Sequence, residues 1–213
     1  MNFFKAVLFF LFLTTVTHAG QPYADAALIA QIGQKYNEFA KKRFFYQQQT
    51  LDAVAGKSDL EKMEEVNTFY NEVKYAPDMK VYGVSDYWAT PWEFLGKDMG
   101  DCEDYVIAKY FALVYLGVDS KKLFFTYVRS TQFKEAHMVL TYFATARAEP
   151  LIMDNNNHRV LPASKRLDLT PIYNFSGTSL YKASGDGAGA KVENEKVHKN
   201  WDELNLNIQR KKI

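Results

Sequence analysis

The sequence predicts a single α+β domain in which helices come first and an antiparallel sheet follows. The first half of the chain carries apolar residues at helical spacing. Three later runs, beyond residue 121, are rich in Phe, Tyr, Val and Ile, which is typical of strands. Helices followed by strands, without regular alternation of the two, indicate the α+β class. No internal repeat is present, and the length suits one domain after a short leader.

Three helices are predicted in the first half of the chain. Apolar spacing favours a helix over residues 24–39. Ser58 and Glu61 form a capping box, in which each side chain satisfies a free backbone N–H, and this motif starts the second helix. The third helix is predicted to begin near Cys102 and to end at Gly117, a residue suited to the left-handed conformation after a helix.

The second half predicts three strands, over residues 122–129, 136–143 and 150–153. Residues 160–173 contain two prolines, which remove donors from a hydrogen-bonded ladder. We therefore expect this segment to be a loop or an edge strand.

Residues 78–100 lack any periodicity and contain Trp88 and Trp92. A long irregular segment inside a compact domain is more often functional than idle. The two tryptophans are predicted to line a groove that binds an extended peptide substrate. The alternative interpretation is that both are core residues, because large aromatic side chains are as common in cores as in interfaces.

The first 19 residues are typical of a signal peptide. Lys5 supplies a positive charge, and residues 6–16 form an apolar stretch before a plausible cleavage site after Ala19. This stretch is too short to span a bilayer, which needs about 20 residues. The alternative is an uncleaved anchoring segment. We expect export to the periplasm, with no membrane-embedded part in the mature protein.

The domain boundaries follow from this pattern. Residues 1–19 are the predicted signal peptide and residues 20–183 the predicted catalytic domain. Residues 184–190 are rich in Gly and Ala, so residues 184–213 are predicted to be a flexible linker and tail. The tail contains a short helix that is expected to pack through Trp201 and Leu204. The net charge of +1 indicates no nucleic-acid partner, and a monomer is the expected state.

Cys102 is the only cysteine of the chain. In an exported protein a single cysteine cannot form an internal disulfide, so its thiol is either spare or reactive. Its position at a predicted helix N-terminus favours a thiolate. The alternative is a small buried apolar residue, which is what most free cysteines are.

His137 and Asp154 lie in two neighbouring predicted strands, and Cys102 precedes both, which suggests a cysteine nucleophile with its base and orienting acid. A four-residue hairpin loop over 144–147 would place His137 directly opposite Asp154. Residues paired in this way have Cβ atoms about 4.5–5.5 Å apart, within reach of a hydrogen bond. We therefore predict a catalytic triad of these three residues. Zinc held by the same three side chains is a weak alternative, because no local ligand pair supports it.

Three carboxylates, Asp101, Glu103 and Asp104, flank the predicted nucleophile. Negative charge near a thiol opposes its ionisation. Two interpretations remain open from the chemistry alone. The acids can simply complement the positive end of the helix dipole, or they can bind a hard cation, most plausibly Ca²⁺.

Several motifs resemble those of the bacterial transglutaminase-like cysteine proteinases, and the resemblance covers roughly residues 23–181. Trp92 departs from the pattern, because a smaller apolar residue is expected at its position. The motifs that carry the resemblance are DYWATPWEFL at 86–95, GDCEDY at 100–105, AHMVL at 136–140, the Asp154-Asn155 turn, and LPAS at 161–164.

The resemblance implies a papain-like, transglutaminase-type core in which the helix carrying the nucleophile packs on an antiparallel sheet. It implies that Cys102, His137 and Asp154 form the triad. It also implies Ca²⁺ as a cofactor, with Asp101 and Glu103 as ligands and Asp104 as a further one.

The implied substrate is the N-terminal region of a large, repeat-rich surface adhesin, cut next to a di-alanine. The implied partner is an inner-membrane receptor that responds to cyclic di-GMP and retains the protease, so that the adhesin stays on the surface and supports biofilm. Two alternatives are transglutaminase-type acyl transfer and a catalytically silent peptide-binding module. The intact Cys, His and Asp argue against the silent module.

Overall fold

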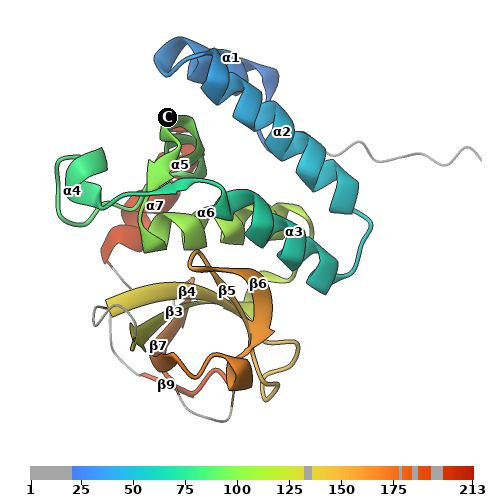
Figure 1. Cartoon of the computed structure of the whole chain (residues 1–213), viewed down its shortest axis with the longest axis vertical. Helices are drawn as coiled ribbons and strands as arrows, with labels where there is room; N and C mark the ends of the chain where they lie inside the picture. Colours follow the sequence, from blue (N-terminus) through green and yellow to red (C-terminus); the bar gives the residue numbers. More distant parts are fainter. Residues whose placement is uncertain (1–20, 132–135, 178, 184–186, 193–198) are drawn as a thin grey trace, which may run out of the picture.

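The computed structural model describes residues 21–213 except 132–135, 178, 184–186 and 193–198. A layer of helices covers one face of a seven-stranded antiparallel sheet (Figure 1), which confirms the α+β prediction. The predicted signal peptide, residues 1–19, lies outside the described residues. Among the helices that the structure does describe, none combines the length and apolar character required to cross a membrane.

The predicted first helix is in fact two helices. Asn37 breaks the helical run, because its side-chain oxygen accepts a hydrogen bond from the Ala40 N–H and starts a new helix. As a result Phe39, the last residue of the predicted helix, points away from the core and is 72% exposed. The helices up to residue 115 are α1 (Ala26–Lys35), α2 (Glu38–Val54), α3 (Asp59–Asn71), α4 (Asp78–Val81), α5 (Pro91–Lys97) and α6 (Cys102–Tyr115).

The starting and ending signals of the other two predicted helices are confirmed. Ser58 and Glu61 form the expected capping box at the start of α3, although Leu60 is exposed rather than buried. Helix α6 begins at Cys102 and is followed by Gly117 with φ of +84°, a conformation that glycine adopts at little cost.

The segment over residues 78–100 is more ordered than expected. It contains α4 and α5, and α5 begins with a second capping box between Thr90 and Glu93, with Pro91 at its first position. The capping box and the proline can both be read from the sequence. The helix is too short, and too rich in aromatic residues, to show a clear helical period.

The sheet order is β6-β5-β4-β3-β7-β8-β9, and a two-residue parallel pair joins β1 and β2. The expectation of a loop or edge for residues 160–173 holds up to residue 168, where β6 is an edge strand and a turn follows it, but it is wrong for β7, which lies inside the sheet. A register shift in β3 between Tyr127 and Val128 lies opposite Pro171, so the proline sits at an irregularity where its missing donor is tolerated. The strands are β1 (Lys74–Tyr75), β2 (Met99–Gly100), β3 (Leu123–Ser130), β4 (Ala136–Tyr142), β5 (Leu151–Asp154), β6 (Asn157–Pro162), β7 (Leu169–Ser176), β8 (Ser179–Lys182) and β9 (Ala190–Lys191).

The predicted pairing of β4 with β5 was wrong by two residues. Leu140 pairs with Met153, whereas a loop over 144–147 would have paired it with Leu151. The loop that connects the two strands is longer than expected. A two-residue shift keeps every side chain on its face of the sheet. His137 and Asp154 therefore become diagonal neighbours instead of direct partners, and they still share one face.

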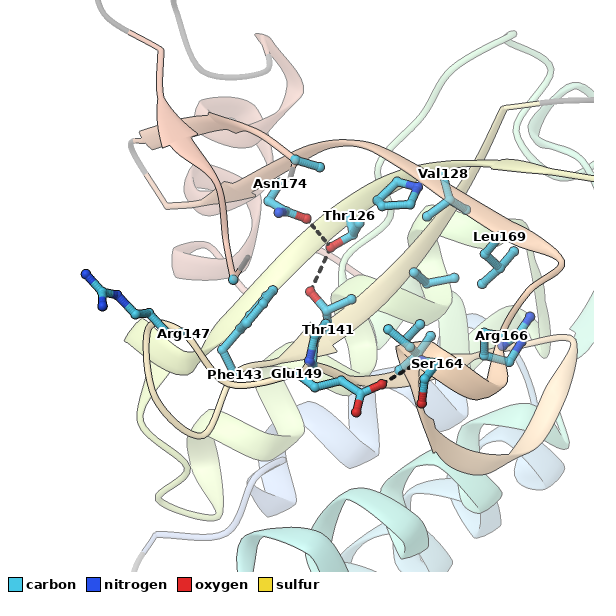
Figure 2. A pocket seen from close by; sticks show the side chains of 17 residues that line it. Thr126, Val128, Thr141, Phe143, Arg147, Glu149, Ser164, Arg166, Leu169 and Asn174 are labelled. Atoms are coloured by element: carbon cyan, nitrogen blue, oxygen red, sulfur yellow. Dashed lines mark hydrogen bonds between the residues drawn. The ribbon is translucent and has the colours of Figure 1, made fainter. Parts of the chain in front are cut away.

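The main core lies between the helices and the sheet, where α6 packs against β4 and β5. Helix α7 (Lys199–Gln209) joins this core through Trp201 and Leu204, which are 8% and 1% exposed, as expected for the tail helix. A separate cavity of about 830 Å³ lies between the other face of the sheet and the segments around residues 147–150 and 163–171 (Figure 2).

Candidate active site

The candidate nucleophile, Cys102, is the first residue of α6. The residue as a whole is half-buried, and its thiol donates to the Glu103 carboxylate, with Sγ 3.1 Å from Oε2. The backbone of Met138 also hydrogen-bonds to the thiol. Because Met138 directly follows His137 in β4, the thiol lies beside the strand that carries the predicted base.

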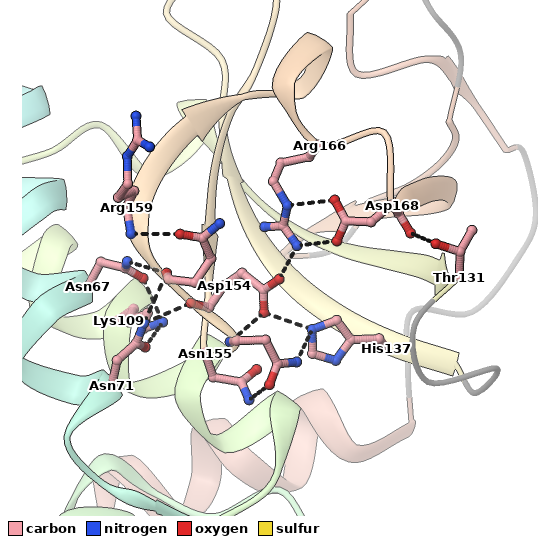
Figure 3. Close-up of polar contacts among 12 residues, drawn as sticks. Asn67, Asn71, Lys109, Thr131, His137, Asp154, Asn155, Arg159, Arg166 and Asp168 are labelled. Carbon is pink, nitrogen blue, oxygen red and sulfur yellow. Dashed lines mark hydrogen bonds and ion pairs between the residues drawn. The ribbon is translucent and has the colours of Figure 1, made fainter.

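His137 and Asp154 are in direct contact. The His137 Nε2 lies 2.9 Å from Asp154 Oδ1 (Figure 3), and both side chains are buried. A hydrogen bond to the carboxylate fixes the tautomer of the imidazole and leaves Nδ1 available to a thiol. The structure thus brings together the His and Asp that the sequence placed on neighbouring strands.

Asp154 is held by more partners than the sequence analysis anticipated. Its Oδ1 also accepts the Asn156 backbone N–H at 3.0 Å, and its Oδ2 accepts Arg166 Nη2 at 2.6 Å. Burial alone would raise the pKa of the Asp154 carboxyl. The hydrogen bonds and charges of His137, Asn156 and Arg166 outweigh burial and hold this pKa well below its usual range. Asp154 is therefore a stable carboxylate.

Burial raises the pKa of the Cys102 thiol, and the charges of Glu103 and Asp101 raise it further. The Met138 backbone opposes this with a smaller effect. The predicted preference for a thiolate is therefore not met by the protein groups alone, because burial, and after it the neighbouring carboxylates, raise the pKa of the thiol.

The acidic residues before and inside the first turn of α6 form a buried cluster with a residue far away in sequence. Asp101 and Asp104 each place a carboxylate oxygen near Asp78, with all three ligand atoms within 4.8 Å of one another. Glu103 belongs to an overlapping group with Asp78 and Asp86. Asp78 and Asp86 were missed from the sequence, although both are acids in the irregular segment that leads into the nucleophile motif.

Each of the three clustered aspartates leaves one oxygen unsatisfied. Asp78 Oδ1, Asp101 Oδ1 and Asp104 Oδ2 are buried and have no hydrogen-bond partner within the described parts of the chain. The other oxygen of each accepts a hydrogen bond from a backbone N–H. The donor is Tyr87 for Asp78, Asp78 for Asp101, and Ala89 for Asp104. Three carboxylates this close together, each with an oxygen that lacks a partner, are a donor set suited to a hard cation.

The electrostatics agree with this geometry. Burial, followed by repulsion from neighbouring carboxylates, raises the pKa of Asp78 to about 6. Burial and the charge of Glu103 raise the pKa of Asp101 to about 8, and burial together with Asp101 raises that of Asp104 well above its usual range. Carboxylates kept this close together without a counter-charge resist ionisation.

Gly100 leaves room for this cluster. A Cβ at position 100 would lie 2.4 Å from Asp104 Oδ2 and 2.6 Å from the Phe94 ring. Any larger residue would therefore displace the unsatisfied Asp104 oxygen. The residues present fit an oxygen-liganded cation such as Ca²⁺.

Trp88 and Trp92 do not line an open groove. Trp88 is 4% exposed and stacks on Phe125 and Phe175, and Trp92 is 7% exposed and packs against Tyr23. This corrects the expectation of an exposed aromatic wall. The observed role of both side chains is core packing.

A buried lysine on the nucleophile helix was also missed. Lys109 Nζ donates to the side-chain oxygens of Asn67 and Asn71 at 2.8 and 2.6 Å. The Asn71 amide in turn donates to the Asp154 backbone carbonyl at 2.8 Å (Figure 3). Burial lowers the pKa of Lys109 to about 7, although the charge of Asp154 acts in the opposite direction. These contacts tie α6 and α3 to the turn that carries Asp154.

A cysteine at the N-terminus of a helix that packs on an antiparallel sheet carrying a His–carboxylate pair is the arrangement found in papain-like cysteine proteases. The family model of the bacterial transglutaminase-like cysteine proteinases matches residues 33–168. The chain belongs to this family. No curated protein matches it significantly.

Solved structures of Legionella pneumophila LapG resemble this chain. The calcium-bound form is 37% identical with a TM-score of 0.72, over 84% of this chain and 97% of its own. The EGTA-treated form is 34% identical with a TM-score of 0.72, over 90% of this chain and 100% of its own. The fold expected from the resemblance, a nucleophile-bearing helix packed on an antiparallel sheet, is confirmed.

Proposed function

We propose that the chain is a calcium-dependent cysteine endopeptidase of the periplasm with Cys102, His137 and Asp154 as its catalytic triad. The observation that carries this proposal is the buried hydrogen bond between His137 and Asp154, beside the helix that begins at Cys102. The family supplies the reaction class, because its members are cysteine proteinases.

In the proposed reaction His137 accepts the Cys102 proton and the sulfur attacks the scissile carbonyl carbon. The C–N bond breaks, the amine leaves with the proton from His137, and a thioester remains on Cys102. Water, deprotonated by His137, then hydrolyses the thioester and releases the acid. Asp154 orients the imidazole and stabilises its charged form. The Cys102 backbone N–H, free at the helix start, is the proposed first oxyanion donor and the Trp88 segment the second.

Calcium is proposed to bind at the acidic cluster. Asp78, Asp101 and Asp104 would supply the unsatisfied oxygens, with Glu103 and Asp86 at the edge of the same site. A bound cation would offset the negative charge that opposes ionisation of Cys102 and would fix the segment that precedes α6. The calcium-bound form of the Legionella pneumophila relative supports calcium as the ion.

The similarity to LapG also supports a substrate and a partner. The proposed substrate is the N-terminal region of a large, repeat-rich surface adhesin, cut at a di-alanine. The proposed partner is a LapD-like inner-membrane receptor for cyclic di-GMP, which would sequester the protease and thereby favour biofilm attachment. Residues 1–19 are proposed to be removed on export, which leaves a catalytic domain from residue 20 and a C-terminal tail.

The test is cleavage of the N-terminal fragment of the same organism's large adhesin by the chain from residue 20. The reaction is run with Ca²⁺, with EGTA, and with Cys102→Ala in place of the wild type. We expect a single cut that both EGTA and the substitution abolish. A cut that survives EGTA would remove calcium from the proposal. A stable complex without cleavage would favour a binding module, and a cross-linked product would favour acyl transfer.

A further inference from the structure

We propose that Arg166 is a positioning residue that fixes the Asp154 carboxylate for its hydrogen bond with His137. This inference rests on the proposed triad. It adds to the proposed site a guanidinium that neither touches the nucleophile nor lies on the strands that carry His137 and Asp154.

Arg166 is itself rigidly held. It follows a short 3₁₀ turn, Ala163–Lys165, and is only 6% exposed. Its Nε and Nη2 donate to the two oxygens of Asp168 at 2.9 and 2.8 Å, a bidentate pair that sets the plane of the guanidinium. The Asp168 backbone carbonyl in turn accepts the Thr131 N–H at 2.9 Å, next to the end of β3. The guanidinium is thereby anchored to the sheet.

The two oxygens of Asp154 have separate tasks. Oδ1 receives His137 and the Asn156 N–H, whereas Oδ2 receives Arg166 Nη2 at 2.6 Å (Figure 3). A carboxylate bonded on only one oxygen can rotate about its last torsion, which is broad for aspartate. Arg166 blocks that rotation.

Arg166 also supplies charge. Asp154 is 1% exposed, and a carboxylate buried to this extent must be paired to remain ionised. His137 offers a full positive charge only when it holds the extra proton during the reaction. Arg166 is charged throughout, so it keeps Asp154 an acceptor in every state of the imidazole.

The position of Arg166 provides an unusual test. Its side chain lines the cavity of about 830 Å³ on the face of the sheet away from α6 (Figure 2). Truncation of the side chain would enlarge this cavity up to the Asp154 carboxylate. A small guanidinium ion could then reach Oδ2 and replace the missing group.

The experiment measures cleavage of the adhesin fragment by Arg166→Ala in the presence of Ca²⁺. We expect kcat to fall by about 100-fold with KM little changed, in line with the effect of losing one catalytic positioning group. Guanidinium chloride at non-denaturing concentration should restore at least about a tenth of the lost rate, whereas ethylammonium chloride should not, because it lacks the planar fork. The matched control is Arg159→Ala, which removes an exposed arginine of β6 and should leave kcat unchanged.

A second readout does not depend on proteolysis. In the Cys102→Ala background, the proton shared by His137 and Asp154 should give a low-field ¹H NMR signal that Arg166→Ala removes and Arg166→Lys partly retains. If the signal and the full kcat both persist in Arg166→Ala, the proposal is wrong. If the wild type cleaves nothing while the signal still depends on Arg166, the positioning role stands and the proposed function fails. If Arg166→Ala does not fold, kcat and the low-field signal are measured in Arg166→Lys and Asp168→Asn instead. Full kcat and an unchanged signal in both would contradict the proposal.

Discussion

The Asp154 carboxylate and the acidic cluster of Asp78, Asp101 and Asp104 are satisfied in opposite ways. Asp154 has a partner for each oxygen, including Arg166, and its pKa lies well below the usual range. In the acidic cluster, Asp78, Asp101 and Asp104 each keep a buried oxygen without a partner, and their pKa values are raised. Asp78 and Asp104 are as buried as Asp154, and Asp101 is half-buried, so the difference lies in the partners.

This difference separates a site that the chain completes by itself from one that it leaves incomplete. A buried charge is stable only when it is paired and hydrogen-bonded. Asp154 is completed by side chains and needs no added ion. The acidic cluster has oxygens of one sign facing one another, and a cation from solution would complete it. The predictions below test this contrast, beginning with the largest expected effect.

Asp154→Asn should lower kcat for adhesin cleavage by about 10²- to 10⁴-fold, because the amide cannot orient the imidazole or stabilise its charged form. Steady-state kinetics on the purified variant provide the measurement. Asp202→Asn, which changes an exposed acid of α7, is the matched control and should be silent. Equal activity of the two variants would show that Asp154 is not a catalytic residue.

Calcium should raise the melting temperature of the wild type relative to EGTA by about 5–10 °C at 100 times the dissociation constant. Ligand binding to the folded state alone causes this shift. Thermal unfolding followed by circular dichroism provides the measurement. Asp104→Asn should show almost no calcium-dependent shift. A shift of the same size in that variant would place the ion elsewhere.

Lys109 is a third buried charge, and its partners Asn67 and Asn71 are neutral. Burial lowers its pKa to about 7 in the folded state, whereas in the unfolded chain the pKa keeps its ordinary value of about 10.4. Between these two pH values the unfolded state binds more protons, so the free energy of unfolding should rise with pH by about 1.4 kcal/mol per unit.

Lys109→Met removes this titration. The wild-type free energy of unfolding, relative to that of Lys109→Met, should therefore increase from pH 7 to pH 9 in urea titrations. Parallel pH profiles for the two proteins would show that Lys109 stays charged in the folded state.

The smallest effect is expected for an exposed ion pair. Lys41 Nζ lies 3.6 Å from Glu38 Oε2 in the first turn of α2, and the two side chains are 37% and 74% exposed. Exposed pairs contribute little because water screens them, so Lys41→Gln should change the melting temperature by less than about 2 °C. A larger change would mean that pairing matters even without burial.

Local signals in the sequence predicted much of the fold and the candidate catalytic pair. The start of α6 at Cys102 and the capping box at Ser58 depend on a few neighbouring residues, and both are present in the structure. The pairing of His137 with Asp154 survived a wrong register, because an error of two residues preserves the face of a strand.

Long-range features could not be read in this way. Asp78 lies 23 residues before Asp101, and the packing of α4 against β2, the strand just before α6, brings the two together. The contact of Arg166 with Asp154 likewise depends on the turn after β6. Trp88 lies in the irregular stretch before α5 and Trp92 lies in α5, which is only seven residues long, so no hydrophobic period indicates which face meets the core.

The most direct test of this account is a calcium titration of the EGTA-treated chain from residue 20, with binding measured by calorimetry and adhesin cleavage measured on the same samples. The account predicts one ion per chain, equal midpoints for binding and cleavage, and loss of both in Asp104→Asn. Full cleavage in EGTA, or unchanged calcium binding in both Asp78→Asn and Asp104→Asn, would contradict it.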